Sequence, residues 1–210
     1  MSRFKPEAVE LFVSTDVETD GPAPGSHSML SLASAVFNPE GELVDTFSAN
    51  LEPLPDATAD RDTMAWWAER PEAWGAATSN AKDPATVMAD YAAWLRGLPG
   101  KPIFLGYPVA FDFPFVSHYL VRFTGTNPFG RSAIDIHSYA MAVLQTASLG
   151  RVIPRRMPPH WIEGDSVASH IALDDATRQG LLFIRMYQEN LRRDSGDSPD
   201  AESMTEYPEW

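Results

Sequence analysis

The chain has 210 residues, no cysteine, and a formal net charge of −13 that comes from 29 acidic and 16 basic residues. This length, with 44% apolar residues, is enough to bury one substantial core, so we expect one compact domain. No apolar run of 18 residues occurs and the start lacks the apolar stretch of a signal peptide, so we expect a cytoplasmic protein without a membrane span. Without cysteine, disulfides, thiolate zinc sites and cysteine nucleophiles are excluded. Carboxylates and imidazoles remain as metal ligands, which favours a hard divalent cation.

The excess of acidic over basic residues argues against a protein that binds long nucleic acid through many phosphate contacts, because such binding depends on Lys and Arg. It is compatible with a site that holds a few terminal nucleotides and concentrates its negative charge around bound cations. Part of the charge lies in residues 194–210, which are acidic and rich in Ser and Pro. We therefore expect one domain over residues 1–193, followed by a flexible acidic tail over residues 194–210.

The first quarter of the chain predicts three consecutive antiparallel strands. Residues 9–15 (VELFVST) are apolar and β-branched, which is typical of a buried strand, and they end directly before Asp16. Residues 30–37 and 43–51 flank the turn sequence NPEG, which predicts a hairpin. An acidic pair, Asp16 and Glu18, thus follows the end of a predicted strand.

Helices and strands alternate in the remainder. Asp83 as N-cap and Pro84 at the first helical position predict a helix that ends at residues 97–100. The other expected elements are strands at 102–105 and 132–136, helices at 111–123, 138–149 and 172–193, and a proline-rich loop at 151–164. This order predicts an α/β fold in which helices cover a mixed sheet.

The acidic pair is one of three candidate groups for chemistry. Residues i and i+2 of a strand point to the same face, so Asp16 and Glu18 can reach one cation if the strand continues that far. Other acid-x-acid triplets occur in so acidic a chain, but this one follows an apolar strand.

Asp112 is the second candidate. It lies between Phe111 and Phe113, where a carboxylate is costly unless it is paired or binds a metal. It falls at the start of the predicted helix 111–123, in which Pro114 must then occupy the first turn, and a plain helix N-cap is the alternative role for Asp112.

The third candidate group is the segment HIALDDA at residues 170–176, with His170 just before a predicted helix and Asp175 on its first turn. An imidazole, with an unperturbed pKa of roughly 6.5, suits a general base that takes a proton from water. A structural capping arrangement is the alternative. Together, the four acids have the composition needed for phosphodiester hydrolysis, in which carboxylates surround two cations roughly 4 Å apart.

The three segments resemble the motifs of the DEDDh family of 3′-to-5′ exonucleases and occur in the family's order. STDVETDGP (14–22) is similar to the first motif, AFDFPF (110–115) to the second and HIALDDA to the third. The resemblance extends from about residue 11 to residue 193. It implies an RNase H-like fold with a mixed five-stranded sheet, three antiparallel strands followed by parallel ones, flanked by helices.

The resemblance also implies two Mg²⁺ or Mn²⁺ ions in the active site. By this resemblance Asp16, Glu18 and Asp175 would hold the first ion. Asp16 would also contact the second ion, which Asp112 would support directly or through water. His170 would activate the attacking water, which assigns the chain to the histidine branch of the family.

The segment TMAWWAER (63–70) follows the third strand, in the region where family members contact the terminal base. It is similar to the Trp-Trp segment of an RNase AS-like subgroup of bacterial exoribonucleases. Aromatic faces stack bases at roughly 1–3 kcal/mol each. Adjacent helical residues point in different directions, so we expect one of Trp66 and Trp67 to stack on substrate and the other to join the core. Met64 and Thr19 are further candidates for substrate contact.

The leading hypothesis is hydrolysis of single-stranded RNA or short oligonucleotides from the 3′ end, with release of nucleoside 5′-monophosphates. A DNA proofreading or repair exonuclease uses the same residues and differs in its contacts to the terminal sugar. A third alternative is a nucleic-acid-binding module that keeps the fold without catalysis. Where many relatives begin the second motif with His-Asn, this chain has Tyr107 and Pro108, so nucleotide contacts are expected to differ. Residue spacing does not decide whether the protein is a homodimer.

Overall fold

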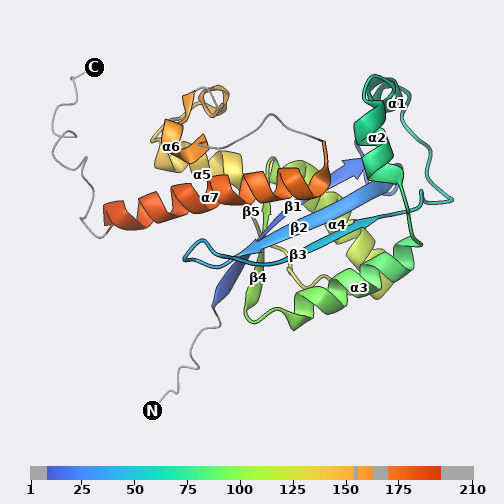
Figure 1. Ribbon diagram of the computed structural model, residues 1–210, viewed down its shortest axis with the longest axis horizontal. Helices are drawn as coiled ribbons and strands as arrows, with labels where there is room; N and C mark the ends of the chain where they lie inside the picture. Colours follow the sequence, from blue (N-terminus) through green and yellow to red (C-terminus); the bar gives the residue numbers. More distant parts are fainter. Residues whose placement is uncertain (1–8, 154–155, 163–169, 195–210) are drawn as a thin grey trace, which may run out of the picture.

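The computed structural model describes residues 9–153, 156–162 and 170–194, so the predicted tail lies outside the described residues from residue 195 on, while Asp194 is the last residue of a helix. A mixed sheet has the strand order β3-β2-β1-β4-β5 (Figure 1). Its strands are β1 (Glu10–Thr19), β2 (Met29–Phe37), β3 (Leu43–Asn50), β4 (Lys101–Gly106) and β5 (Ala133–Asp135). The first three strands are antiparallel, and β4 and β5 run parallel to β1, as predicted.

Helices cover both faces of the sheet. They are α1 (Arg61–Ala68), α2 (Pro71–Thr78), α3 (Pro84–Gly97), α4 (Val109–Thr124), α5 (Ile136–Val143), α6 (Pro159–Ile162) and α7 (Ala172–Asp194), with a 3₁₀ turn at Leu149–Arg151. Helices α5, α6 and α7 lie over one face and α3 and α4 over the other, while α1 and α2 stand at the end of the sheet where β1 ends (Figure 1). No helix among the described residues is long and apolar enough to span a membrane.

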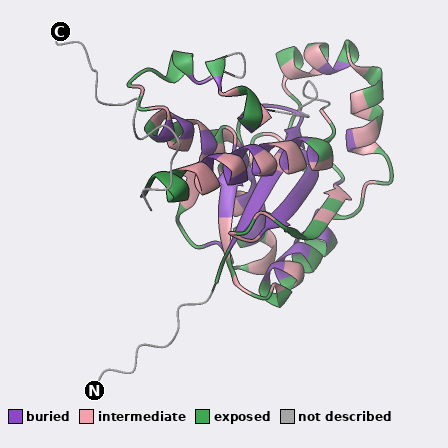
Figure 2. Cartoon of the chain, turned by 60° about the vertical axis from the view of Figure 1, so that its left-hand side comes forward, coloured by how far each residue is buried: buried purple, intermediate pink, exposed green. Residues whose placement is uncertain are grey.

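Two apolar clusters, one on each face, follow from side-chain alternation along β1. Leu11, Val13 and Val17 join the cluster that includes α3 and α4. Phe12 points the other way, into the cluster that includes α5 and α7. The central strands are buried between the helical layers (Figure 2). Burying each large apolar side chain contributes about 1.5–3 kcal/mol, so these clusters are the main source of stability.

Several element boundaries differ from the predicted ones. β1 continues to Thr19, so the acidic pair belongs to the strand. α4 begins two residues earlier than expected, at Val109, which places Pro114 beyond the first turn. α5 ends at Val143 instead of residue 149, and the loop predicted at 151–164 contains α6.

Although the expectation for Trp66 and Trp67 treated their segment as helical, the sequence did not predict bounds for α1 or any helix at α2. Each spans eight residues, too few to show a sustained apolar period. Their start signals are nevertheless present. The Asp60 side chain accepts the N–H of Thr63 at 2.8 Å, and Pro71 occupies the first turn of α2. Asp83 and Pro84 begin α3 in the predicted way.

Helix α7 packs closely against the sheet at Gly180. A Cβ atom at this position would lie 2.3 Å from Cε2 of Phe37 on β2 and 2.9 Å from Cβ of Ser14 on β1. The absence of a side chain at Gly180 thus sets the distance between α7 and the strand that carries the acidic pair.

We expect Gly180→Ala to lower the free energy of unfolding by about 1–3 kcal/mol, because the helix must move away from the sheet. Chemical denaturation measures this change. Gly75→Ala is the matched control, since Gly75 lies in the exposed interior of α2 and an added Cβ meets nothing within 4 Å. The control should raise stability by roughly 0.5–1 kcal/mol. A Gly180→Ala protein as stable as the parent would show that this contact does not constrain α7.

Candidate active site

A pocket of about 240 Å³ lies where β1 ends, and all five predicted residues line it. These are Asp16, Glu18, Asp112, His170 and Asp175. The other lining residues are Val17, Tyr107, Pro108, Phe111, Arg178 and Gln179. Four carboxylates and one imidazole from distant parts of the chain therefore share one cavity.

Strand β1 supplies the acidic pair. Asp16 and Glu18 stand opposite Ala33 and Ser31 of β2, within regular antiparallel pairing. Both residues therefore lie in regular strand, where side chains at positions i and i+2 point to the same face of the sheet. Glu18 is 9% exposed, and Asp16 accepts a hydrogen bond of 2.9 Å from Nε2 of Gln179 on α7.

Asp112 reaches the pocket because β1 is longer than its parallel neighbour. The last residue pair between β1 and β4 is Ser14 with Leu105, so the next part of β1 has no strand partner on that side. The backbone N–H of Val17 instead donates to Oδ1 of Asp112 at 3.3 Å. Gly106 permits this approach, since a Cβ there would lie 2.8 Å from Cα of Val109 and 3.3 Å from Oδ2 of Asp112. Asp112 therefore accepts a hydrogen bond from a backbone N–H on the unpaired edge of β1. It is not the N-cap of α4, because Pro108 occupies that position.

Asp135, at the end of β5, has a structural role. Its Oδ1 accepts the N–H of Ser138 at 2.7 Å and caps α5. Its Oδ2 accepts the N–H of Val109 at 3.1 Å and so holds the first residue of α4. Asp135 thereby helps to place the helix that carries Asp112.

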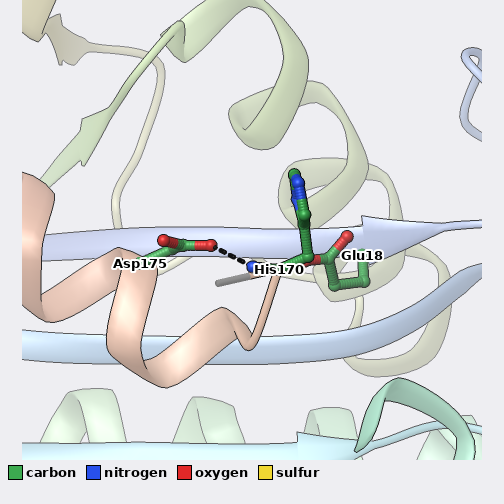
Figure 3. A group of neighbouring side chains, drawn as sticks. All are labelled: Glu18, His170 and Asp175. Carbon is green, nitrogen blue, oxygen red and sulfur yellow. Dashed lines mark hydrogen bonds between the residues drawn. The ribbon is translucent and has the colours of Figure 1, made fainter. Parts of the chain in front are cut away.

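His170 and Asp175 are joined at the start of α7. The backbone N–H of His170 donates to Oδ2 of Asp175 at 2.9 Å (Figure 3). His170 lies before the helix, as expected, and has a left-handed backbone with φ of 54°, which is uncommon for a residue with a side chain. One side-chain N or O atom from each of Glu18, His170 and Asp175 lies within 4.8 Å of the other two, so the imidazole adjoins two carboxyl groups of the pocket.

The carboxyl groups of the pocket disfavour one another's charge. Burial, followed by the charges of Asp16, Asp175 and Asp112, raises the pKa of Glu18 to about 9. Burial and the charge of Asp175 raise the pKa of Asp16 to about 7. The pKa of Asp112 is also raised, by burial and by Asp16, although backbone N–H groups oppose the shift.

This cluster suits a hard divalent cation. Carboxylate oxygens are the preferred ligands of Mg²⁺ and Mn²⁺, and a bound cation would offset both the burial and the neighbouring charges that raise these pKa values. Among the described residues that line the pocket, Arg178 is the one permanently charged base, and it already pairs with Asp175 at 2.9 Å. The donor set therefore fits the metal that the resemblance implies. Asp16, Glu18, Asp112 and Asp175 are the residues that would hold it.

The sequence reasoning missed Gln179 and Arg178. Gln179 is 4% exposed and orients Asp16, while Arg178 orients Asp175. The signal that could have found them is their spacing. They follow Asp175 by four and three residues on a predicted helix, so they lie on its face.

The four predicted substrate contacts lie beside the acidic pocket, and none is among its lining residues. Trp67 is 2% exposed and donates from Nε1 to the carbonyl of Thr19 at 2.9 Å, so both residues belong to the core at the end of β1. Met64 and Trp67 line an apolar cavity of about 240 Å³ with Ala68, Pro71 and Trp74. Trp66 is half-buried and its ring contacts the ring of His170.

The chain is 31% identical over 180 residues to the 3′-5′ DNA exonuclease Cap18 of Escherichia coli, a match that covers 83% of this chain and 90% of that protein. Together with the fold and the site, this similarity identifies a 3′-to-5′ exonuclease of RNase H-like architecture, and the chain belongs to the DEDDh family. No protein-family model matches the chain.

Solved structures share the fold at low sequence identity. The nuclease domain of 3′hExo, a DEDDh family member bound to rAMP, has a TM-score of 0.63 and 14% identity, with 87% of this chain and 93% of that chain covered. Pop2p of S. pombe in its Mg²⁺ and Mn²⁺ bound form has a TM-score of 0.58 and 16% identity, with coverage of 91% and 86%. E. coli exonuclease I in complex with a dA16 oligonucleotide has a TM-score of 0.59 and 17% identity, with coverage of 91% and 45%.

Without metal, the buried acids should make stability depend on pH. Glu18 and Asp16 have folded pKa values of about 9 and about 7, above their ordinary values, so between roughly pH 5 and 9 the folded state binds more protons than the unfolded state. The free energy of unfolding in EDTA should therefore fall as pH rises through this range. Chemical denaturation at three pH values measures the slope.

Glu18→Gln should flatten that slope, and saturating Mn²⁺ should raise the stability of the parent most at high pH. The difference between the parent and Glu18→Gln isolates this group from histidines and exposed acids. Equal slopes in the two proteins would contradict the electrostatic description of the pocket.

Proposed function

We propose that this protein is a two-metal 3′-to-5′ exonuclease that removes nucleotides from single-stranded DNA ends and releases nucleoside 5′-monophosphates. The observation that carries the proposal is the meeting of Asp16, Glu18, Asp112 and Asp175 with His170 in one pocket. Membership of the DEDDh family supports exonuclease chemistry. The relative that is 31% identical is named a DNA exonuclease, which supports DNA over the RNA substrate favoured by the sequence alone.

In this proposal Asp16, Glu18 and Asp175 would hold one divalent ion, and Asp16 and Asp112 would hold the other. Bound ions supply activation of the attacking water and stabilisation of the departing 3′ oxygen. Gln179 and Arg178 keep the Asp16 and Asp175 carboxylates in fixed orientations through their hydrogen bonds. These oriented carboxylates reduce the rearrangement needed when substrate binds.

His170 acts as the general base. Its imidazole accepts the proton of the water whose oxygen forms the new bond to the terminal phosphorus, while the bond from phosphorus to the 3′ oxygen of the preceding nucleotide breaks. His170 suits this role because it lies outside α7 and lines the acidic pocket. One of its ring nitrogens also lies within 4.8 Å of a carboxylate oxygen of Glu18 and of Asp175.

The choice between DNA and RNA depends on contacts to the terminal sugar, because the 2′-hydroxyl is the group that differs. The fold does not decide it, since its structural neighbours include one bound to rAMP and one bound to a dA16 oligonucleotide. Tyr107, Pro108 and Phe111 are apolar or aromatic residues in the lining of the pocket and are candidates for contact with the terminal sugar.

Asp16→Ala and Asp175→Ala should abolish Mn²⁺-dependent trimming of a 5′-labelled DNA oligonucleotide, because each removes a ligand that no neighbouring group replaces. His170→Ala should lower turnover by at least about 100-fold while leaving Mn²⁺ affinity by calorimetry nearly unchanged. Asp174→Ala is the matched control, since Asp174 is exposed and adjacent to Asp175 in sequence. Full activity in Asp16→Ala or Asp175→Ala would refute the assignment.

Substrate choice is tested by digesting DNA and RNA oligonucleotides of the same sequence side by side. We expect kcat/KM to be at least about tenfold higher for DNA, which corresponds to about 1.4 kcal/mol in the activation free energy. An oligonucleotide blocked at its 3′ end serves as the control for direction and should resist digestion. Equal or faster digestion of RNA would restore the exoribonuclease hypothesis.

A further inference from the structure

The ring of His170 packs against Trp66 of α1. The two ring centroids are 4.8 Å apart and the ring planes are nearly perpendicular, at 87°. This contact is additional to the backbone bond between His170 and Asp175, which fixes the main chain but not the imidazole. The orientation of the imidazole therefore depends on what surrounds the ring.

Trp66 is itself held by two neighbours. The Arg70 guanidinium lies 4.0 Å from the centre of the indole ring, and Nη1 of Arg70 donates to the carbonyl of Trp66 at 2.9 Å. The ring of Trp67 meets that of Trp66 at 4.8 Å in a T-shaped contact. Trp67 is anchored in turn by its hydrogen bond to Thr19. A continuous chain of contacts thus links the end of the acid-bearing strand β1 to the ring of His170.

His170 borders open space on more than one side. It lines the acidic pocket and also a second cavity of about 390 Å³, whose other lining residues are Glu69, Arg70, Pro71, Glu72 and Ala73. A third cavity, of about 100 Å³, also includes His170 in its lining, and the residue is half-buried. The cavities leave space beside His170, and the ring contact with Trp66 limits rotation of the imidazole on one side.

We propose that Trp66 is a positioning residue that keeps the His170 imidazole over the acidic pocket, and that it is not the stacking surface for the terminal base. Arg70 covers one face of the indole and two further rings meet it in T-shaped contacts, so little of Trp66 is left for a nucleobase. The proposal rests on the role of His170 as general base. Misplacing a catalytic group by about 1 Å can slow a reaction by roughly 100-fold, so loss of Trp66 should be seen in turnover.

The test measures kcat, KM and Mn²⁺ affinity for Trp66→Ala, Trp66→Phe and His170→Ala, and for the double variant Trp66→Ala with His170→Ala, on a DNA oligonucleotide. Trp66→Ala should lower kcat by roughly 10- to 100-fold, with KM and calorimetric Mn²⁺ affinity within about twofold of the parent. Trp66→Phe should recover most of the loss because it retains a ring. The double variant should be no slower than His170→Ala, since Trp66 acts through that imidazole.

Trp94→Ala is the matched control. It removes a half-buried indole from α3, which packs on the face of the sheet opposite α7, and should leave kcat unchanged. Arg70→Met provides a second variant that keeps the indole and removes the cation above it. It should lower kcat in the same direction by a smaller factor, and circular dichroism confirms that each variant is folded.

Three outcomes would overturn the proposal. A raised KM with unchanged kcat in Trp66→Ala would indicate base stacking. A double variant slower than His170→Ala by the full Trp66→Ala factor would show that Trp66 acts independently of the imidazole. Full activity in His170→Ala would remove the general-base role as well, so failure of that role is distinguishable from failure of the positioning role alone.

Discussion

Four carboxyl groups share the pocket at the end of β1, and the unfavourable free energy of burying them beside one another is the constraint on which the site depends. Burial and neighbouring charges raise the pKa values of Glu18, Asp16 and Asp112. Such a cluster opposes folding unless counter-charges or cations neutralise it. The same unfavourable electrostatics favour the divalent ions of the proposed function, so affinity for the metal and instability without it would have one cause.

Three separate elements hold the acids in place. β1 carries two of them on one face, α7 brings a third across the close contact at Gly180, and α4 brings Asp112 to the unpaired edge of β1. Each placement depends on a backbone feature and not on the acid alone. β1 extends past β4, Gly106 leaves room for α4, and Gly180 lets α7 approach the sheet.

The α1–α2 segment lies beside the site but contains none of the three DEDDh motif segments. It stands at the end of the sheet beside the pocket and contacts His170 through Trp66 (Figure 1). Its aromatic side chains form a packed series in which Trp67 touches both Trp66 and Trp74. Because the indole N–H of Trp67 also donates a hydrogen bond to the carbonyl of Thr19, a shift of this segment would be transmitted to the strand that carries the acids.

The sequence by itself determined the features that local patterns encode. Apolar runs and the turn sequence NPEG predicted the antiparallel strands, Asp83 and Pro84 predicted the start of α3, and three spaced motifs identified the five pocket residues. Tertiary structure decided which partner each side chain meets. It made Asp112 the acceptor for Val17 instead of an N-cap, placed Gln179 on Asp16, and buried Trp67 while directing Trp66 to His170. The physical reason is that these contacts join residues far apart in the chain, whereas periodicity and capping report interactions within a few residues.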